Sequence, residues 1–592
     1  MGLAGAVGRE ATYISAIART LIGLRGVTPD SPGTIVDVVE KQARAAPDAP
    51  VFYYLDSTMS YRALDDRANR VAHWAKHAGI RRGEAVALLM ENRPDYVATW
   101  LGLLKVGAVA ALINTNLRGA ALAHSIAIAE ARHAIVGAEL AATFADAGAI
   151  PKAWSAGGAL PGFEDFDAAL AAEPAGAADK AWRAGVTCKD KAFYIYTSGT
   201  TGLPKASNFT HLRMLFMMHG FASGLNARAS DRMYNVLPLY HSAGGVCAIG
   251  PALLTGGSVI LKRKFSVSEF WDDVHRYRAT LFQYIGELCR YLLNAPTAAH
   301  ERDHAIRAIT GNGLRPEIWR TFQERFAIPK IVEFYGATEG NVSMLNYDGK
   351  VGAVGRIPSY MRSIVTTRIV KFDVESEMPV RGPDGFCIEC ADNETGETVG
   401  KIANEPGKSF DGYTREADTR KKVLHDVFEK GDAWFRTGDL MRRDAKGYFY
   451  FVDRIGDTFR WKGENVATSE VAEALGVVPG VREANVYGVA VPGADGRAGM
   501  AALVTARGFD IAKLAGALSG NLPAYARPIF IRLLPELEIT GTFKQRKVDL
   551  VKDGFDPKAI RDPLYWLNPL TEQYEALTAA AHAAIAGGAV KI

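Results

Sequence analysis

The sequence is poor in cysteine and has no dense run of basic residues. Five cysteines among 592 residues form an odd, sparse set that excludes the disulfide framework of a small secreted domain. Lysine and arginine (69) nearly balance aspartate and glutamate (65), so the formal net charge of +4 gives little attraction for nucleic acid. We therefore expect a reducing compartment and no nucleic-acid partner.

A single C-x-x-C pair, Cys387 and Cys390, stands without a second pair of ligands. A zinc site normally needs four ligands, and a redox pair normally opens a helix. Residues 386–390 alternate instead like a strand. This pattern favours a structural role for both thiols.

Long apolar helices and a signal-peptide pattern are also missing. Residues 11–24 are apolar but short and broken by Arg19, so they fit an amphipathic surface helix. Residues 233–261 carry no Asp, Glu, Lys or Arg, yet prolines and glycines interrupt them, which favours buried strands and loops around a pocket. We expect a cytoplasmic protein, with peripheral contact at the inner face of a membrane as the alternative.

Short apolar runs alternate with helical sequence in the first part of the chain. Residues 85–90 and 108–114 are such runs, and residues 61–78 are helical. This alternation predicts parallel strands joined by crossover helices, an α/β fold of βαβ subdomains. Residues 150–185 are rich in Ala, Gly and Pro and predict a long surface connection.

The pattern changes twice further on. Residues 364–388 predict short strands joined by turns, and hence a small β-barrel-like subdomain. After Asp453, predicted helices (471–475, 511–522) and strands (483–491, 501–505) indicate a smaller α+β unit, and residues 570–585 predict a final helix. We place the domain boundary after Asp453, so that residues 1–453 form the N-terminal domain and residues 454–592 the C-terminal domain.

Residues 196–205 read Tyr-Thr-Ser-Gly-Thr-Thr-Gly-Leu-Pro-Lys, a loop that follows a predicted strand at residues 192–196. Its glycines allow close backbone approach, and its hydroxyl and N–H groups can donate to phosphate oxygens. The spacing is not that of a Walker motif, and a Ser/Thr/Gly loop alone is more often a plain turn. The candidate phosphate ligands are Thr197, Ser198, Gly199, Thr200, Thr201, Gly202 and Lys205.

This loop resembles the phosphate-loop signature of the adenylate-forming superfamily, which includes acyl-CoA synthetases, luciferases and peptide-synthetase adenylation domains. Similar motifs follow in the family's order at residues 237–241, 311–313, 335–340, 437–439, 453–454 and 542–544. Together they cover most of the chain. The resemblance implies an enzyme that uses ATP and Mg²⁺ to form an acyl-adenylate.

Residues 335–339 combine an aromatic ring for stacking on a purine, a glycine, a hydroxyl and a carboxylate suited to Mg²⁺. Alone, a Thr-Glu pair is more often a helix cap. By resemblance, Glu339 is the catalytic metal ligand and Thr338 contacts phosphate, while Tyr335 and Gly336 belong to the nucleotide site.

Other nucleotide contacts also follow from the resemblance. Gly311 and Asn312 would line the adenine pocket, although a tight turn is the plainer interpretation, and Pro316 breaks the dinucleotide pattern G-x-G-x-x-G. Asp439 would accept hydrogen bonds from the ribose hydroxyls, for which a carboxylate has two acceptor oxygens. Arg454 would complete this set.

Residues 453–466 resemble the fatty-acid-transport-protein and very-long-chain acyl-CoA synthetase group. Gly456 would be the hinge of a mobile C-terminal domain, because glycine accepts large changes in φ and ψ. Arg460, Trp461 and Gly463 would approach the coenzyme A channel. Without the family context, residues 460–462 could equally be a solvated strand.

Lys544 resembles the lysine that bridges the carboxylate and the α-phosphate during adenylation. Lys547 is the alternative, because Thr542 and Phe543 displace the lysine from the preceding glycine. Either would act in the first half-reaction only.

The expected activity is that of a long- or very-long-chain fatty acid–CoA ligase. By resemblance His241 lies at the mouth of the acyl pocket, and Met214 and Met218 could line it, although all three fit a plain core equally well. The alternatives are a steroid or bile-acid ligase and a fatty-acid uptake protein that traps its cargo as the thioester.

Overall fold

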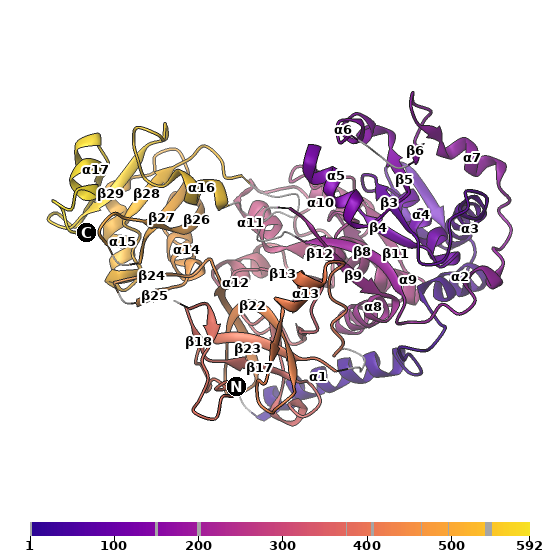
Figure 1. Ribbon diagram of the computed structural model, residues 1–592, viewed down its shortest axis with the longest axis horizontal. Coiled ribbons are helices and arrows are strands. Elements are labelled where there is room, and N and C mark those ends of the chain that lie inside the picture. The colour runs from indigo at the N-terminus through magenta and orange to yellow at the C-terminus, as the bar shows by residue number, and fades with distance from the viewer. Residues whose placement is uncertain are drawn as a thin grey trace.

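The computed structural model describes residues 3–148, 152–197, 203–374, 376–403, 408–462, 464–494, 496–538 and 547–592. Figure 1 shows a large α/β region in indigo and magenta, a β subdomain in orange below it, and a C-terminal region in yellow at the opposite end. The chain passes through these regions in sequence order.

The first sheet has seven strands and is parallel except at one edge. Helix α4 (Pro94–Lys105) connects β3 to the adjacent parallel strand β4 and packs against α3 (Tyr61–His77). These elements confirm the predicted βαβ arrangement. In sheet order the strands are β7 (Glu164–Asp165), β6 (Lys152–Ala156), β5 (His133–Gly137), β3 (Ala85–Leu89), β4 (Val109–Leu112), β8 (Lys191–Thr197) and β9 (Lys205–Thr210).

The predicted surface connection at residues 150–185 is wrong. Strand β6 pairs in parallel with β5, and helix α7 (Phe166–Ala172) follows it. The indole of Trp154 lies edge-on to that of Trp74, with ring centroids 5.1 Å apart. Strand pairing and burial of this aromatic ring outweigh the weak local propensity of an alanine-rich segment.

The second sheet has eight strands, of which the central six are parallel. Helix α8 (His211–Leu225) follows β9 of the first sheet and is largely buried beside this one. In sheet order the strands are β15 (Ser343–Asn346), β14 (Ile331–Gly336), β13 (Ala308–Asn312), β12 (Leu281–Ile285), β10 (Arg232–Asn235), β11 (Ser258–Leu261), β1 (Pro50–Tyr54) and β2 (Ser57–Ser60).

Residues 233–261 contain buried strands, as expected, but also helices that the sequence did not predict. A π-helical turn, η3 (Ala243–Ala248), and α9 (Gly250–Thr255) lie between β10 and β11. A Cβ atom on Gly245 would lie 2.0 Å from the carbonyl oxygen of Leu239, so only glycine fits there. Close packing of backbone on backbone explains why glycines here do not mark a loop.

The orange region is an antiparallel sheet, which agrees with the predicted β subdomain, but only β17 of its strands lies within the predicted residues 364–388. Cys387 and Cys390 are both buried against it, and burial raises the pKa of the Cys390 thiol to about 12. Its strands are β16 (Gly355–Arg356), β23 (Tyr448–Arg454), β22 (Ala433–Arg443), β20 (Gly396–Lys401) and β17 (Thr367–Val370), with β21 (Val423–His425) beside β22.

Residues 454–592, the C-terminal unit, build a hydrophobic core from their own side chains. The predicted helix at 570–585 is wrong in its first half, where β30 (Gln573–Ala576) pairs with β29 and buries Tyr574. The remaining elements include the hairpin β24 (Phe459–Trp461) and β25 (Glu464–Val466), helices α14 (Thr468–Gly476) and α17 (Ala579–Ala586), and strands β26 (Val481–Ala490), β27 (Arg497–Thr505), β28 (Phe530–Leu533) and β29 (Leu564–Asn568).

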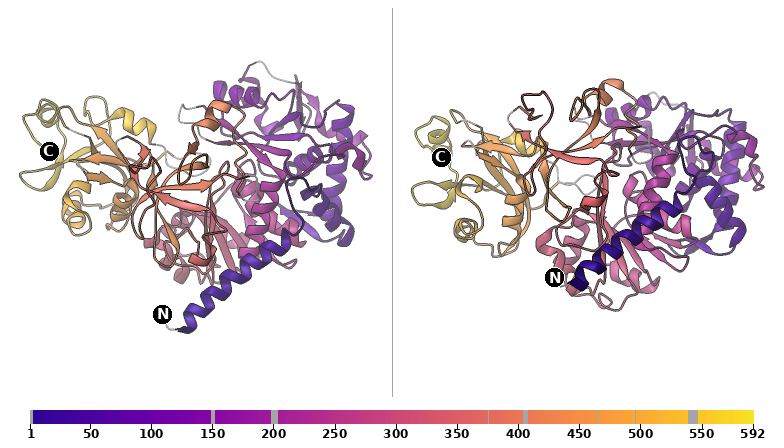
Figure 2. Two further views of the ribbon diagram at one scale, coloured as in Figure 1. Left: turned by 60° about the horizontal axis from the view of Figure 1, so that its bottom comes forward. Right: turned by 90° about the horizontal axis from the view of Figure 1, so that it is seen from below.

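The first helix, α1 (Leu3–Gly23), lies obliquely along the underside of the molecule (Figure 2) and packs on α8. Its charged side chains turn toward the protein: Glu10 pairs with Arg356 at 2.6 Å, and Arg19 donates to the carbonyl of Ser223 at 2.9 Å. Within the described ranges, no helix is long and apolar enough to cross a membrane.

Candidate active site

The parallel strands of the second sheet bring the predicted adenine residues to one edge. Gly311 and Asn312 end β13, and Tyr335 and Gly336 end the neighbouring strand β14. The carboxyl ends of adjacent parallel strands meet at the same edge, where α/β folds usually bind ligands. The sequence motifs therefore come together as expected for one site.

Two positions at this edge of the sheet require glycine. A Cβ atom on Gly311 would lie 2.3 Å from the carbonyl oxygen of Tyr284, and one on Gly286 would lie 1.7 Å from that of Gly313. Neither position has room for a larger residue. The loop after β13 is thus held close to the preceding strand.

Glu333, which was not predicted as a site residue, holds this loop through its carboxyl group. Its Oε1 accepts the amide of Leu314 at 3.1 Å, and the hydroxyl of Tyr284 donates to its Oε2. Burial raises the pKa of Glu333 to about 8. Nothing in the local sequence distinguishes this glutamate from an ordinary strand residue.

Asp439 joins the adenine edge to the β subdomain. Its carboxylate accepts the hydroxyl of Tyr335, and Nε of Arg454 lies 3.6 Å from its Oδ1. Asp439 and Arg454 are also register partners across β22 and β23. A tyrosine, a carboxylate and a guanidinium predicted from three distant motifs are therefore in contact.

Thr338 and Glu339 lie in the loop between β14 and β15, next to this group. The Oγ atoms of Thr338 and Ser242 are 3.1 Å apart, and the hydroxyl of Tyr413 donates to Oε1 of Glu339 at 2.8 Å. Burial raises the pKa of Tyr413, which keeps its hydroxyl protonated as a donor. Neither Ser242 nor Tyr413 belongs to a recognised sequence motif, so neither was predicted.

The ends of the predicted phosphate loop lie on adjacent antiparallel strands. Thr197 ends β8, Lys205 begins β9, and the two are register partners. Nζ of Lys205 lies 2.9 Å from Asp418 and 5.6 Å from the ring centre of Tyr413. Ser198, Gly199, Thr200, Thr201 and Gly202 lie outside the described residues.

The predicted acyl-pocket residues lie in or near the core. Met214 and Met218 are fully buried on α8, and His241 is half-buried just before η3. A Cβ atom on Gly250 would lie 2.4 Å from the side chain of Met218, so α9 packs directly on it. These positions fit both interpretations that the sequence left open.

The predicted hinge region begins where β23 ends. Gly456 has a φ of +91°, a conformation that strains other residues, while Trp461 is buried in the C-terminal core and Arg460 is half-buried on β24. Asp453 accepts the amide of Thr468 at 2.5 Å and its hydroxyl at 3.1 Å, which joins the last strand before the hinge to α14. Gly463 lies outside the described residues.

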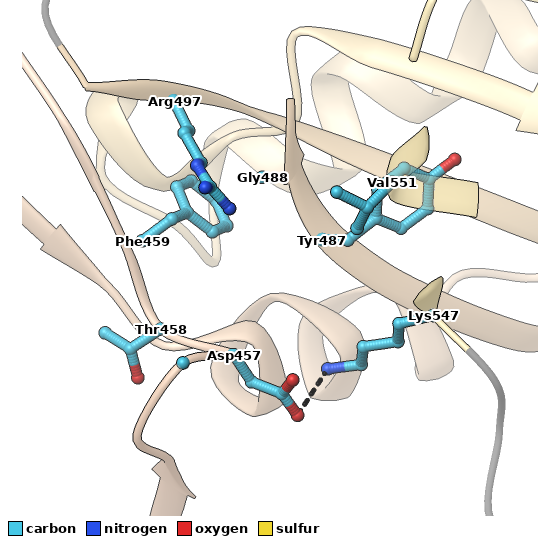
Figure 3. A pocket seen from close by; sticks show the side chains of 9 residues that line it. Asp457, Thr458, Phe459, Tyr487, Gly488, Arg497, Lys547 and Val551 are labelled. Carbon is cyan, nitrogen blue, oxygen red and sulfur yellow. Dashed lines mark hydrogen bonds and ion pairs between the residues drawn. The ribbon is translucent and has the colours of Figure 1, made fainter. Parts of the chain in front are cut away.

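A small cavity of about 40 Å³ lies beside the hinge (Figure 3). The ammonium of Lys547 points toward Asp457, 3.0 Å away, and both line the cavity; it also donates to Thr468 at 2.9 Å. In this arrangement Lys547 fastens the hinge to α14. Lys544 lies outside the described residues.

Two family models match the chain. The model described as AMP-binding enzyme matches residues 39–397, and that described as AMP-binding enzyme C-terminal domain matches residues 470–544. Long-chain fatty acid transport protein 2 of Rattus norvegicus is 41% identical over 573 residues, which cover 94% of this chain and 92% of the relative. Long-chain fatty acid transport protein 1 of Homo sapiens is 43% identical, with 90% and 83% covered.

Solved structures share the fold at lower identity. ATP-bound MatB from Rhodopseudomonas palustris superposes with a TM-score of 0.73 at 24% identity, over 87% of this chain and 98% of the other. A Mycobacterium tuberculosis fatty acyl CoA synthetase gives a TM-score of 0.60 at 24% identity, over 88% and 98%. These likenesses confirm the predicted α/β fold with a large N-terminal and a smaller C-terminal part.

Proposed function

Because the chain belongs to the family of AMP-binding enzymes, we propose that it activates a long- or very-long-chain fatty acid with ATP and transfers the acyl group to coenzyme A. The observation that carries the proposal is the convergence of Tyr335, Thr338, Glu339 and Asp439 at one site. The fatty acyl substrate is inferred from relatives named long-chain fatty acid transport proteins.

The chemistry proceeds in two steps. A carboxylate oxygen of the fatty acid attacks the α-phosphorus of ATP, an O–P bond forms, the bond to the β-phosphate breaks, and pyrophosphate leaves. The thiol of coenzyme A then attacks the acyl carbonyl, loses its proton, and displaces AMP. Positioning and charge neutralisation carry most of the catalysis, because phosphoryl transfer needs little covalent participation by the protein.

Each part of the nucleotide has candidate partners. Tyr335 would stack on adenine beside Gly311, Asn312 and Gly336, and Asp439 with Arg454 would hold the ribose. Thr338 and the loop from Thr197 to Lys205 would donate to the phosphates. Lys544 would neutralise charge on the carboxylate and the α-phosphate during the first step.

Glu339 fits the role of magnesium ligand. Its carboxylate accepts a hydrogen bond from a neutral donor, the hydroxyl of Tyr413, and Thr338 is the preceding residue of the chain. Mg²⁺ usually takes one or two carboxylates together with substrate phosphates. When bound there, Mg²⁺ would offset negative charge on the phosphates of ATP.

The second step would need a different set of groups in the same site. We propose that residues 454–592 move as a domain about Gly456, bringing Arg460, Trp461 and Gly463 toward coenzyme A. The positive φ of Gly456 and the self-contained core after Asp453 support this division. The hydrocarbon chain would enter beside His241, along Met214 and Met218 of α8.

Peripheral membrane contact is proposed through the outer face of α1. Val7, Ile14, Leu21 and Ile22 are 55–74% exposed there, whereas the charged side chains of α1 face inward. An apolar outer face of this kind suits the interface of a bilayer that supplies fatty acid. Ile14→Glu and Leu21→Glu together should abolish flotation with phosphatidylcholine vesicles; unchanged flotation would contradict the contact.

The deciding experiment is a substrate panel. The purified protein is given ATP, Mg²⁺, coenzyme A and palmitate, lignocerate, cholate or benzoate, and AMP and the acyl-CoA product are quantified. Palmitate or lignocerate should be preferred. A preference for cholate would support the steroid-acid alternative, and movement of fatty acid into vesicles without ATP consumption would support a transporter instead.

A further inference from the structure

The guanidinium of Arg213 joins segments of the active site that are far apart in the sequence. Its Nε donates to Oδ2 of Asp411 at 3.1 Å, and its Nη2 donates to the carbonyl of Ser409 at 3.2 Å. Its Nη1 donates to the carbonyl of Thr338 at 3.3 Å and to that of Gly340. Only 10% of the Arg213 side chain is exposed, so water screens these bonds little.

Arg213 is itself fixed at the start of α8. Its amide donates to Oγ1 of Thr210, the N-cap residue, at 3.3 Å. The hydroxyl of Thr210 in turn donates to Oδ2 of Asp411 at 3.1 Å. The backbone and the side chain of Arg213 are thus both tied to the same carboxylate.

The segment around Asp411 is also aligned with the phosphate loop. The backbone amide of Asn208 on β9 donates to the carbonyl of Gly412 at 3.0 Å. The backbone amide of Thr414 donates to the carbonyl of Ala206 at 3.1 Å. Strand β9 begins at Lys205, the last residue of the phosphate loop. The segment that carries Tyr413 therefore keeps a fixed register beside that loop.

In the chain, Glu339 stands between Thr338 and Gly340, and the carbonyl groups of both neighbours accept from Arg213. The side chain of Glu339 is held by Tyr413, whose segment Arg213 anchors through Asp411 and Ser409. One guanidinium thus positions both the backbone that carries Glu339 and the donor that orients its carboxylate.

We propose that Arg213 is a positioning residue for the adenylation step, holding Glu339 and Thr338 in place for Mg²⁺-ATP. The inference rests on the proposed function. Arginine is needed because its planar fork donates from Nε and both Nη atoms in different directions, whereas lysine donates from a single nitrogen. A displacement of about 1 Å at a reacting centre can slow catalysis by about 100-fold.

The test compares Arg213→Met and Arg213→Lys with the wild type in both half-reactions. Fatty-acid-dependent exchange of pyrophosphate into ATP reports adenylation, and its Mg²⁺ dependence is measured separately. For Arg213→Met, kcat/KM for ATP should fall by about 100-fold and the Mg²⁺ requirement should rise. Thioester formation from supplied acyl-adenylate should be unchanged. For Arg213→Lys, kcat/KM for ATP should lie between the values of the wild type and of Arg213→Met.

Arg307 offers a matched control. It pairs with Asp231 and donates to the carbonyls of Leu225 and Asn226 at the other end of α8. Arg307→Met should lower the melting temperature without changing the Mg²⁺ requirement. If Arg213→Met and Arg307→Met lose both half-reactions in parallel with stability, Arg213 is merely structural and the inference is overturned.

The remaining outcomes separate the two proposals. A wild-type protein without fatty-acid-dependent exchange contradicts the proposed function, and the role of Arg213 with it. Wild-type exchange together with normal exchange by Arg213→Lys contradicts only the positioning role. This second comparison decides the question even if Arg213→Met fails to fold.

Discussion

The hydroxyl of Tyr413 donates to Oε1 of Glu339 at 2.8 Å, across 74 positions of the chain. Tyr413 belongs to the segment that runs along β9, and Glu339 to the loop after β14. The contact therefore fastens the proposed magnesium ligand to the strand that follows the phosphate loop. It also gives the carboxylate of Glu339 a neutral donor that orients it.

Tyr413→Phe should weaken the response to Mg²⁺ with little change in the fold. A hydrogen bond to a charged group contributes about 1.5–3 kcal/mol, so kcat/KM for ATP should fall by about 10-fold or more. The measurement is pyrophosphate exchange at graded Mg²⁺ concentrations. Tyr450→Phe is the matched control, since Tyr450 donates to Asp444 at 3.1 Å in the same β subdomain; equal effects of both variants would contradict the assignment.

Asp439→Asn should raise the KM for ATP by about 10-fold for each ribose hydrogen bond that loses its charged acceptor. The substitution keeps the size of the side chain but removes the ion pair with Arg454. Comparison with 2′-deoxy-ATP identifies the cause. The wild type should discriminate against 2′-deoxy-ATP, and the variant should discriminate less; the same ratio in both would show that Asp439 does not hold the ribose.

Lys544→Ala and Lys547→Ala should differ in which step they impair. Lys544→Ala should severely slow adenylation and largely spare thioester formation from supplied acyl-adenylate. Lys547 pairs with Asp457 at the hinge, so Lys547→Ala should change the stability or the domain motion and affect both steps. Selective loss of adenylation in Lys547→Ala would reverse the two roles.

Two carboxylates face each other where the C-terminal unit meets the large region. Glu473 lies on α14 and Glu317 on α12 (Pro316–Arg325), and Oε1 of Glu317 lies 3.7 Å from where a Cβ atom on Gly476 of α14 would be. Burial raises the pKa of Glu473 to about 7, and repulsion from Glu317 adds to the shift, while Arg315 opposes it. Burial also raises the pKa of Glu317.

This pair predicts a contact that weakens with rising pH. The ordinary pKa of glutamate is near 4.5, whereas that of Glu473 in the folded protein is about 7. The folded protein therefore binds this proton more tightly than the unfolded chain does. The contribution of Glu473 to the stability of the folded protein should be fully present below pH 4.5. It should be lost as pH rises through 7. Melting temperature against pH should show this fall in the wild type and a smaller one in Glu473→Gln.

Glu470 on the same helix is exposed and provides the control. Repulsion from Glu470 contributes to the raised pKa of Glu473 less than burial and Glu317 do, so Glu470→Gln should change the pH profile less than Glu473→Gln does. A profile for Glu473→Gln that matches the wild type would show that this carboxyl group does not titrate at the contact.

The sequence predicts those site residues that belong to motifs, and it misses their partners. Tyr335, Glu339 and Asp439 lie in recognisable runs. Tyr413, which contacts Glu339, and Arg213 and Glu333, which hold the neighbouring loops, lie in unremarkable sequence. Their contacts depend on how distant strands pair, and neither periodicity nor spacing along the chain encodes that. The residues of the phosphate loop at 198–202 remain predictions from sequence.

The same limit applies to the fold. Residues 85–90 and 108–114 are apolar enough to identify β3 and β4 without tertiary information. Residues 152–156 become a strand only because β5 offers an edge and Trp74 a packing surface. Alanine is depleted in strands, so here the tertiary environment overrides the local preference of an alanine-rich segment.

The proposed adenylation is tested most directly by isotope exchange. Labelled pyrophosphate is supplied with ATP, Mg²⁺ and a fatty acid, without coenzyme A, and the label that enters ATP is measured. Formation of acyl-adenylate is reversible before the thiol enters, so label should enter ATP only when palmitate or lignocerate is supplied. Mass spectrometry should detect the corresponding acyl-AMP. Release of ADP and phosphate, or exchange that does not depend on a fatty acid, would contradict the proposed function.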